Sequence, residues 1–148
     1  HSNLAKINLI NSNVLDLYSG VGSFGIECLS RGAKKVTFVE KNSTALKVLN
    51  KNINSLEIKN LSEIYPIETI SYIKSFNNEK FNIIFLDPPF AEKKFINDLM
   101  AIKKSSMCSK NHLIIVHRER KADEDLKNIL NIFSIKNYGR SKIIFGGF

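Results

Sequence analysis

The chain has 148 residues, of which 43% are hydrophobic and 24% are charged, enough to bury the core of one domain. We therefore expect residues 1–148 to form a single domain and to act as a monomer. The apolar runs are far shorter than the roughly 20 residues that cross a bilayer, and no cleavable leader precedes them. This pattern predicts a cytoplasmic protein and argues against membrane insertion.

The cysteines and histidines are too scattered to form a recognisable metal site. Cys28 and Cys108 lie far apart without a C-x-x-C pair, and His1, His112 and His117 lack the spacing of metal ligands. We expect reduced thiols and no bound metal.

The net charge of +8 is the main compositional signal. Excess lysine and arginine on a small domain is what binding to a nucleic-acid backbone requires. A general bias toward Lys, Asn and Ile explains the same charge equally well, so the positions of the basic residues have to decide.

The first predicted elements surround a glycine turn. Residues 1–11 read as the tail of a helix and a connector, and Asn13–Tyr18 is a strand. Ser19–Gly25 follows at once as a literal G-x-G-x-x-G that opens a helix ending near Gly32. This order is typical of the nucleotide-binding half of a doubly wound sheet. The carboxylate of Asp16 lies beside the turn.

Acidic residues follow the next two predicted strands. Lys35–Glu40 forms the second strand, and Glu40 lies at its carboxyl end, where an acidic residue holds a ribose in nucleotide-binding folds. Leu61–Tyr65 is a weaker third strand. Glu68 lies just beyond it, in a short helix predicted over residues 67–75.

The fourth strand, Phe81–Leu86, is a short apolar run that ends in Asp87-Pro88-Pro89-Phe90. Neither proline has an N–H, and each biases its predecessor toward extended backbone, so Asp87 and Pro88 present oxygen acceptors in a fixed direction. These two acceptors suit the planar amine of a nucleobase, with Phe90 stacked on the ring. In isolation, a plain strand-ending turn explains the motif as well.

The remaining elements complete a mostly parallel sheet. The pattern predicts a helix over residues 93–103, a strand over 113–117 and a helix over 123–130. Two strand-like runs, Asn131–Asn137 and Ser141–Phe145, flank a short turn and predict an antiparallel hairpin. Five strand–helix units before a hairpin imply an α/β fold with helices on both faces of the sheet.

Polar residues collect at the carboxyl ends of the predicted parallel strands, where such sheets bind their ligands. They are Asp16 with the glycine turn, Glu40, Glu68, the Asp87–Phe90 turn and Arg118. Because five separate loops need not each place polar groups there, this co-location favours one ligand site.

Two cofactors compete for the site. In a nicotinamide-dependent oxidoreductase, the helix N-terminus holds pyrophosphate and Glu40 holds ribose. Asp16 would repel pyrophosphate but suits a ligand with ammonium and sulfonium charge, and that ligand is S-adenosylmethionine. The nicotinamide alternative also leaves the Asp87–Phe90 turn unexplained.

The sequence resembles the bacterial small-subunit (16S) ribosomal RNA guanine-N2 methyltransferases. The similarity lies in residues 14–33, which end in Ser30-Arg31-Gly32-Ala33, in the Asp87–Phe90 turn and in Tyr138-Gly139-Arg140. It implies a Rossmann-like class I methyltransferase with a mostly parallel seven-stranded sheet and a C-terminal antiparallel hairpin. Members of the family begin with a segment implicated in RNA docking, of which this chain holds little.

The resemblance also implies roles for the site residues. The residues expected to hold S-adenosylmethionine are Asp16, Tyr18, Gly20 and Gly22 at the methionine part, Glu40 at the ribose and Glu68 near the adenine. The residues expected at the target guanine are Asp87 and Pro88 as acceptors, Pro89 in the rigid turn and Phe90 as the stacking ring. The implied partner is ribosomal RNA or a small-subunit particle.

The substrate stays open at this point, because the same turn serves amino-methyltransferases that act on DNA adenine or on a protein amide. The candidate phosphate contacts are Lys93, Lys94, Arg118, Arg120, Lys121, Arg140 and Lys142. Any one of these side chains is more often a solvated surface charge.

Overall fold

The computed structural model describes residues 7–75 and 78–148. Its strands are β1 (Asn13–Leu17), β2 (Lys35–Val39), β3 (Ser62–Tyr65), β4 (Phe81–Leu86), β5 (Cys108–Glu119), β6 (Asn131–Tyr138) and β7 (Ser141–Gly147). Its helices are α1 (Ser23–Ser30), α2 (Ser43–Ser55), α3 (Thr69–Lys74) and α4 (Phe95–Lys104), with a 3₁₀ turn, η2, at Lys59–Leu61. No helix in these two ranges combines the length and apolar character that crossing a membrane requires.

The strands form one seven-stranded sheet in the order β3-β2-β1-β4-β5-β7-β6. Strands β1 to β5 pair in parallel, whereas β7 runs antiparallel to both β5 and β6. The predicted α/β fold, with a mostly parallel sheet and a C-terminal antiparallel hairpin, is confirmed.

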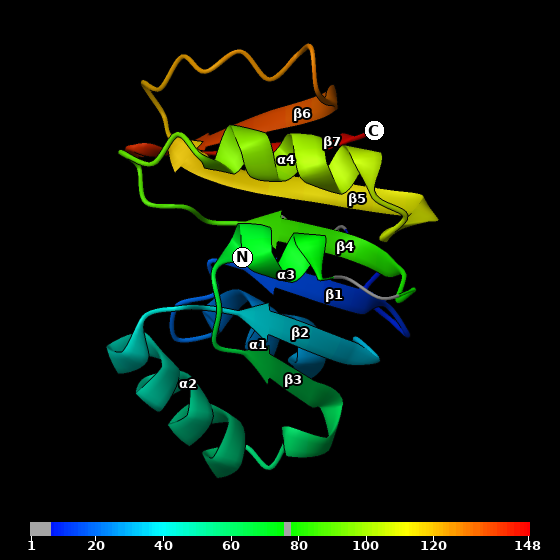
Figure 1. Cartoon of the computed structure of the whole chain (residues 1–148), viewed down its shortest axis with the longest axis vertical. Helices are drawn as coiled ribbons and strands as arrows, with labels where there is room; N and C mark the ends of the chain where they lie inside the picture. The colour runs from blue at the N-terminus through cyan, green and yellow to red at the C-terminus, as the bar shows by residue number, and fades with distance from the viewer. Residues whose placement is uncertain (1–6, 76–77) are drawn as a thin grey trace.

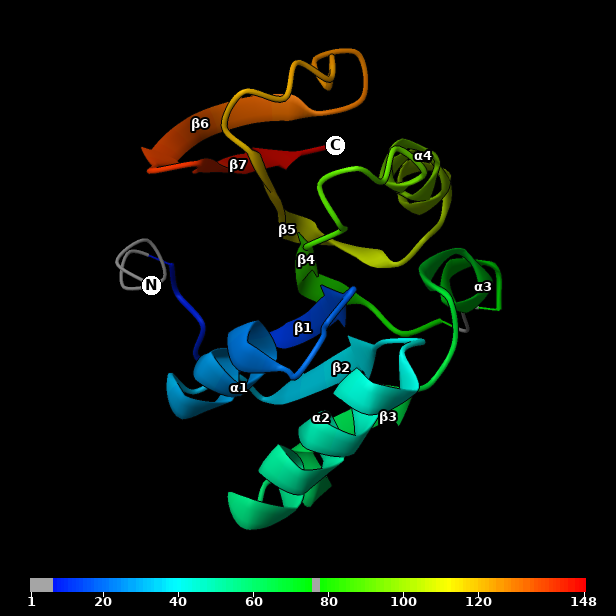
Figure 2. The same ribbon diagram turned by 90° about the vertical axis from the view of Figure 1, so that its left-hand side faces the viewer.

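Helices cover both faces of the sheet (Figures 1 and 2). On one face, Leu49 and Ile53 of α2 are buried in the same cluster as Phe38 of β2. On the other face, Leu99 of α4 is buried in a cluster with Leu15 of β1. Strand β4 lies between these clusters and is buried along nearly its whole length, as a continuous apolar run predicts.

The glycine turn lets α1 begin close to the sheet. Gly22 precedes the helix with a φ of 90°, a left-handed conformation that favours glycine. A Cβ at Gly22 would clash with Leu49, and one at Gly25 would clash with Phe38. The turn therefore fixes the approach of α1 to β2 and α2.

The predicted helix over Asp123–Leu130 is wrong. The structure has a single turn there, in which the N–H groups of Ile129 and Leu130 donate to the Leu126 carbonyl at 3.0 and 2.8 Å. A segment this short is a marginal helix by propensity alone. Burial of Leu126 and Leu130 and an ion pair made by Glu124 set its course instead.

Other boundaries also shift. Strand β5 covers Cys108–Glu119, longer than the predicted 113–117. Of the predicted helix tail at residues 1–11, residues 1–6, including His1, lie outside the described residues. Residues 7–11 contain a bend and a turn rather than a helix.

Candidate functional site

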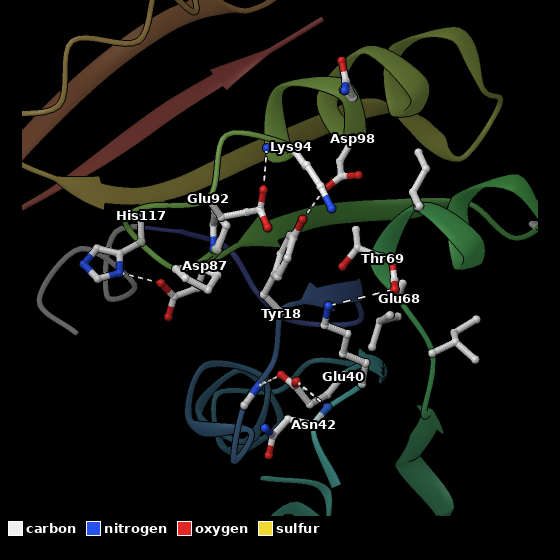
Figure 3. A pocket seen from close by; sticks show the side chains of 18 of the residues that line it. Tyr18, Glu40, Asn42, Glu68, Thr69, Asp87, Glu92, Lys94, Asp98 and His117 are labelled. Carbon is white, nitrogen blue, oxygen red and sulfur yellow. Dashed lines mark hydrogen bonds and ion pairs between the residues drawn. The ribbon is translucent and has the colours of Figure 1, made fainter. Parts of the chain in front are cut away.

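The carboxyl ends of the parallel strands border a cavity of about 680 Å³ (Figure 3). Of the residues predicted for the site, those that line it are Tyr18, Gly20, Glu40, Glu68, Asp87, Pro88, Pro89 and Phe90. The two halves of the predicted site, the glycine turn and the proline turn, therefore meet at one cavity. The structure places these residues there from loops that follow four different strands, β1, β2, β3 and β4.

Glu40 joins two loops at the cavity wall. Its Oε1 accepts a hydrogen bond from the Gly20 N–H at 2.7 Å, and its Oε2 accepts one from the Asn42 N–H at 3.0 Å. Asn42 in turn caps α2 by accepting a hydrogen bond from the Ala45 N–H at 2.9 Å. Each carboxylate oxygen retains a further lone pair, so the fixed side chain can still hold hydroxyl groups.

Asp16 and Gly22, which were also predicted for the site, are buried and do not line the cavity. The Asp16 side chain is buried, and its Oδ2 accepts a hydrogen bond from the Gly25 N–H at 3.1 Å, which holds the first turn of α1. Its Oδ1 has no hydrogen-bond partner among residues 7–75 and 78–148. Burial, reinforced by the nearby charges of Asp87 and Glu40, raises the pKa of Asp16 well above its usual range. Contact of Asp16 or Gly22 with a ligand stays a prediction.

Tyr18 reaches across the cavity to a carboxylate that sequence reasoning missed. Its hydroxyl donates a hydrogen bond to Asp98 Oδ2, and burial raises the pKa of both groups. The available signal was the position of Asp98 on the apolar stripe of α4. Its neighbours on that stripe, at the i, i+3, i+4, i+7 spacing, are Phe95, Leu99 and Ile102. A carboxylate on a buried stripe marks a polar role.

The proline turn continues from the end of β4. The Asp87 N–H donates to the Leu17 carbonyl at 3.3 Å, which ties the turn to the end of β1. Pro88 is buried, whereas the Phe90 side chain is 39% exposed at the cavity. The Pro88 carbonyl accepts no hydrogen bond from the described part of the chain.

His117 contacts this turn from β5 and was also missed by sequence reasoning. Its Nδ1 lies 2.7 Å from Asp87 Oδ1, and its ring packs edge-on against Phe90 with 5.6 Å between centroids. Sequence analysis considered His117 only as a possible metal ligand and rejected it for lack of ligand spacing. Its place at the carboxyl end of a parallel strand was the available signal.

A second cavity, of about 340 Å³, lies on the other side of Asp87 and His117, which line both. Its walls are mainly apolar and aromatic. Phe24 and Phe85 stack there with 4.0 Å between ring centroids, and Tyr138 and Phe145 contribute from the C-terminal hairpin. The Asp87–His117 contact therefore lies between a polar and an apolar cavity.

The first cavity is rich in acids. The ionisable residues that line it are Glu40, Glu68, Asp87, Glu92 and Asp98 against Lys41, Lys94 and His117. On a chain with a net charge of +8, an excess of carboxyl groups in one hollow is a local reversal of sign. Such a lining favours a cationic ligand over an anionic one.

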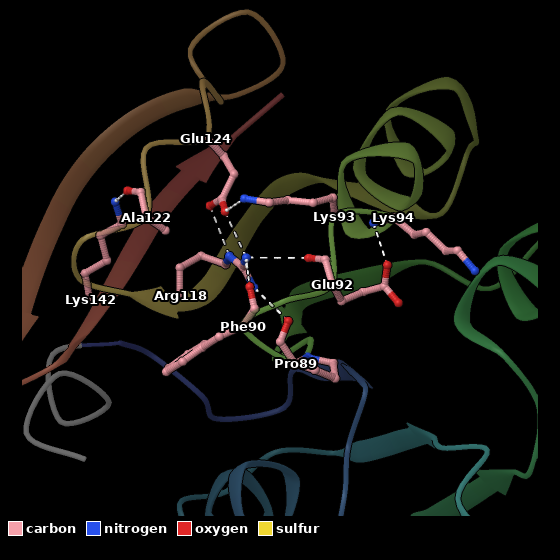
Figure 4. A network of polar contacts seen from close by, with 9 residues as sticks. All are labelled: Pro89, Phe90, Glu92, Lys93, Lys94, Arg118, Ala122, Glu124 and Lys142. Carbon is pink, nitrogen blue, oxygen red and sulfur yellow. Dashed lines mark hydrogen bonds and ion pairs between the residues drawn. The ribbon is translucent and has the colours of Figure 1, made fainter.

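Arg118 is not a phosphate contact as predicted. Its side chain has no exposed surface and pairs with Glu124 at 2.9 Å (Figure 4). It also donates hydrogen bonds to the carbonyls of Pro89 and Phe90 at 3.2 and 2.9 Å. A guanidinium enclosed in this way cannot reach a phosphate outside the protein.

The other candidate phosphate contacts differ in their surroundings. Lys93 pairs with Glu124, Lys142 donates to a backbone carbonyl and Lys94 lines the first cavity. Lys93 and Lys94 are nevertheless exposed, as are Arg120, Lys121 and Arg140, and contact of these five with phosphate stays a prediction.

Comparison with known proteins identifies similar chains. Residues 2–147 match the family model described as conserved hypothetical protein 95. The chain is 33% identical over 111 residues to ribosomal RNA small subunit methyltransferase D of Buchnera aphidicola subsp. Acyrthosiphon pisum. It is 34% identical over 111 residues to the protein of the same name from Haemophilus influenzae. These alignments cover 75% and 74% of this chain but only 58% of each relative.

A solved structure shares the fold over nearly the whole chain. It is described as a putative methylase from Haemophilus influenzae and superposes with a TM-score of 0.84 and 28% identity. The superposition covers 98% of this chain and 91% of that one.

Proposed function

The chain belongs to the family described as conserved hypothetical protein 95, and we propose that it transfers a methyl group from S-adenosylmethionine to the N2 amine of a guanine in small-subunit ribosomal RNA. One observation carries the proposal. Gly20 of the glycine turn and the preceding Tyr18, Glu40 after β2, and the Asp87–Phe90 turn border the same cavity. The names of the curated relatives support ribosomal RNA as the substrate.

The lining of the first cavity supports S-adenosylmethionine as the cofactor. Its volume of about 680 Å³ lies within the range of small-molecule sites. Its excess of carboxyl groups suits a ligand with sulfonium and ammonium charge, whereas the pyrophosphate of a nicotinamide dinucleotide would meet Glu40, Glu68 and Asp87. Glu40, held by two backbone N–H groups, is the residue proposed to bind the ribose hydroxyls.

When bound, S-adenosylmethionine supplies a methyl group on a positively charged sulfur. The Asp87 carboxylate and the Pro88 carbonyl would accept hydrogen bonds from the guanine amine and fix its direction, while Phe90 stacks on the base. The amine proton passes to Asp87 or to water. Alignment of this kind contributes roughly 7–11 kcal/mol in favourable cases, so positioning is the main task of the turn.

Exposed cations near this edge support an RNA substrate. The Arg120 N–H donates to the Arg140 carbonyl at 2.6 Å, which brings two basic loops together beside the end of β5. Arg120, Lys121 and Arg140 are the proposed phosphate contacts. The target guanine must leave its stack, which costs least in a loop or an opened helix.

The test is a methyl-transfer assay with labelled S-adenosylmethionine and under-methylated small-subunit particles, followed by digestion of the RNA to nucleosides. Label in N2-methylguanosine is the expected result. Label found only in DNA adenine or in protein would instead support an amino-methyltransferase of another class. Calorimetric titration with S-adenosylmethionine and with a nicotinamide dinucleotide separates the two cofactors, and binding of the dinucleotide alone would overturn the proposal.

A further inference from the structure

Arg118 and Glu124 form a buried ion pair next to the Asp87–Phe90 turn, with side chains 0% and 4% exposed. The guanidinium donates from Nε to Glu124 Oε1 at 3.1 Å and from Nη2 to Glu124 Oε2 at 2.9 Å. Lys93 donates to the same carboxylate at 2.8 Å. These contacts hold the pKa of Glu124 at about 2, below its ordinary value of 4.5.

The same guanidinium also binds the backbone of the turn (Figure 4). Nη1 donates to the Pro89 carbonyl at 3.2 Å, and Nη2 donates to the Phe90 carbonyl at 2.9 Å. The Phe95 ring of α4 lies under the guanidinium, 4.3 Å from its central carbon. The planar guanidinium of Arg118 is therefore held on one face by the Phe95 ring and at one edge by the Glu124 carboxylate.

The turn thus has two kinds of oxygen acceptor. The carbonyls of Pro89 and Phe90 are occupied by Arg118, whereas the Pro88 carbonyl accepts no hydrogen bond from the described residues. His117 contacts the Asp87 carboxylate at Oδ1. The acceptors that remain available are those assigned above to the guanine amine.

We propose that Arg118 and Glu124 are positioning residues for methyl transfer: the clamp they form, named here the Arg118–Glu124 clamp, fixes the turn so that only Asp87 and Pro88 offer acceptors to the substrate. The inference rests on the proposed function for its substrate. The clamp gives Glu124 an indirect role in holding the acceptors, although the segment that contains Glu124 lines neither cavity.

The position of Arg118 follows from strand register. Leu86, the last residue of β4, pairs with Val116 of β5, so the residues that follow Val116 run beside the proline turn. Side chains alternate between the faces of a strand. His117 accordingly reaches the Asp87 carboxylate, and Arg118 points to the α4 face and reaches the carbonyls beyond Pro88.

A stabilising role alone does not account for this arrangement. The desolvation of two buried charges offsets much of their attraction, so a well-packed apolar pair of similar volume is often as stable. An apolar pair, however, has no donor for the carbonyls of Pro89 and Phe90. The distinctive effect of the clamp is therefore geometric.

The test compares Arg118→Lys and Glu124→Gln with the unmodified protein. Lysine keeps the positive charge beside Glu124 but has no planar fork, so it cannot hold both carbonyls. We expect kcat for methyl transfer to fall by about tenfold or more, because small displacements of aligned groups are costly. The dissociation constant for S-adenosylmethionine, measured by calorimetry, should change by less than about twofold, since neither residue lines the first cavity.

Glu27→Gln is the matched control, because Glu27 forms an exposed ion pair with Arg31 on α1 and lines neither cavity. It should leave kcat unchanged. Glu124→Gln preserves the size of the side chain and one oxygen acceptor, so it provides the comparison if Arg118→Lys does not fold. A folded clamp variant, verified by circular dichroism, that keeps the unmodified kcat would overturn the inference.

A second measurement is independent of activity. The Glu92 N–H donates to the Pro89 carbonyl at 2.8 Å and closes the turn that Arg118 holds. Hydrogen exchange of this amide should be faster in both clamp variants and unchanged in Glu27→Gln. If the unmodified protein transferred no methyl group to guanine, the proposed function would fail, while the exchange rates would still decide whether the clamp exists.

Discussion

His117 Nδ1 lies 2.7 Å from Asp87 Oδ1, at the boundary between the two cavities. The contact joins the ends of two neighbouring parallel strands, β4 and β5. It holds one oxygen of the carboxylate and so restricts the direction of the other. The rotation of Asp87, and with it the position of a bound amine, depends on this imidazole.

Replacing His117 with leucine should lower kcat for methyl transfer. The loss removes a hydrogen bond to a charged group, worth roughly 1.5–3 kcal/mol, so a fall of about tenfold to a hundredfold is expected. His117→Asn should keep part of the rate, because its amide can still donate to Asp87. Steady-state kinetics at saturating cofactor measure both, and equal rates for the leucine variant and the unmodified protein would contradict the prediction.

Asp87→Ala should abolish most transfer while the cofactor still binds. The change removes the acceptor that orients the amine and the group that can take its proton, effects worth at least about a hundredfold in kcat. Asp87→Asn retains one oxygen acceptor, so its kcat should lie between those of Asp87→Ala and the unmodified protein. Calorimetry with S-adenosylmethionine serves as the control. A parallel loss of cofactor affinity would assign Asp87 to cofactor binding instead.

Glu40→Ala should mainly weaken the binding of S-adenosylmethionine, in contrast to Asp87→Ala. It removes the carboxylate that accepts hydrogen bonds from Gly20 and Asn42, so both loops lose a common anchor as well as the proposed ribose contact. The dissociation constant for S-adenosylmethionine should rise by about tenfold or more, the scale of lost hydrogen bonds to a charged group. Glu57→Gln, an exposed change beyond α2, is the control and should bind normally.

Strand ends explain why much of the site was predictable from sequence. Glu40 and Asp87 each follow an apolar run directly, and parallel strands bring their carboxyl ends to one edge. Local patterns do not encode contacts between distant segments. Tyr18 and Asp98 are 80 residues apart in the chain, and Arg118 reaches a carbonyl 29 residues away.

Arg118 illustrates the limit most clearly. Sequence pattern treats an arginine after an apolar strand as a solvated charge, because arginine is rarely buried without a partner. Its partner, Glu124, lies in the segment that was expected to be a helix. Both errors therefore have one cause, the ion pair that draws this segment onto the turn.

Acid should weaken the protein through Glu124. Its pKa is about 2 in the folded protein and ordinarily 4.5, chiefly because Arg118 donates hydrogen bonds to it. A lowered folded-state pKa stabilises the fold fully above the unfolded pKa, and this contribution is lost as the pH falls through the folded one. The difference in unfolding free energy between the unmodified protein and Glu124→Gln should therefore shrink from pH 4.5 to about 2.

Urea unfolding at about pH 6 and about pH 3 measures this difference, since the window between the two pKa values lies on the acid side. Asp16 and Asp98 have raised pKa values and act with the opposite sign, but both proteins contain them. Subtracting the unfolding free energy of Glu124→Gln from that of the unmodified protein therefore isolates the contribution of Glu124. A difference that is the same at both pH values would mean that Glu124 is not held ionised by Arg118, and the electrostatic basis of the clamp would be lost.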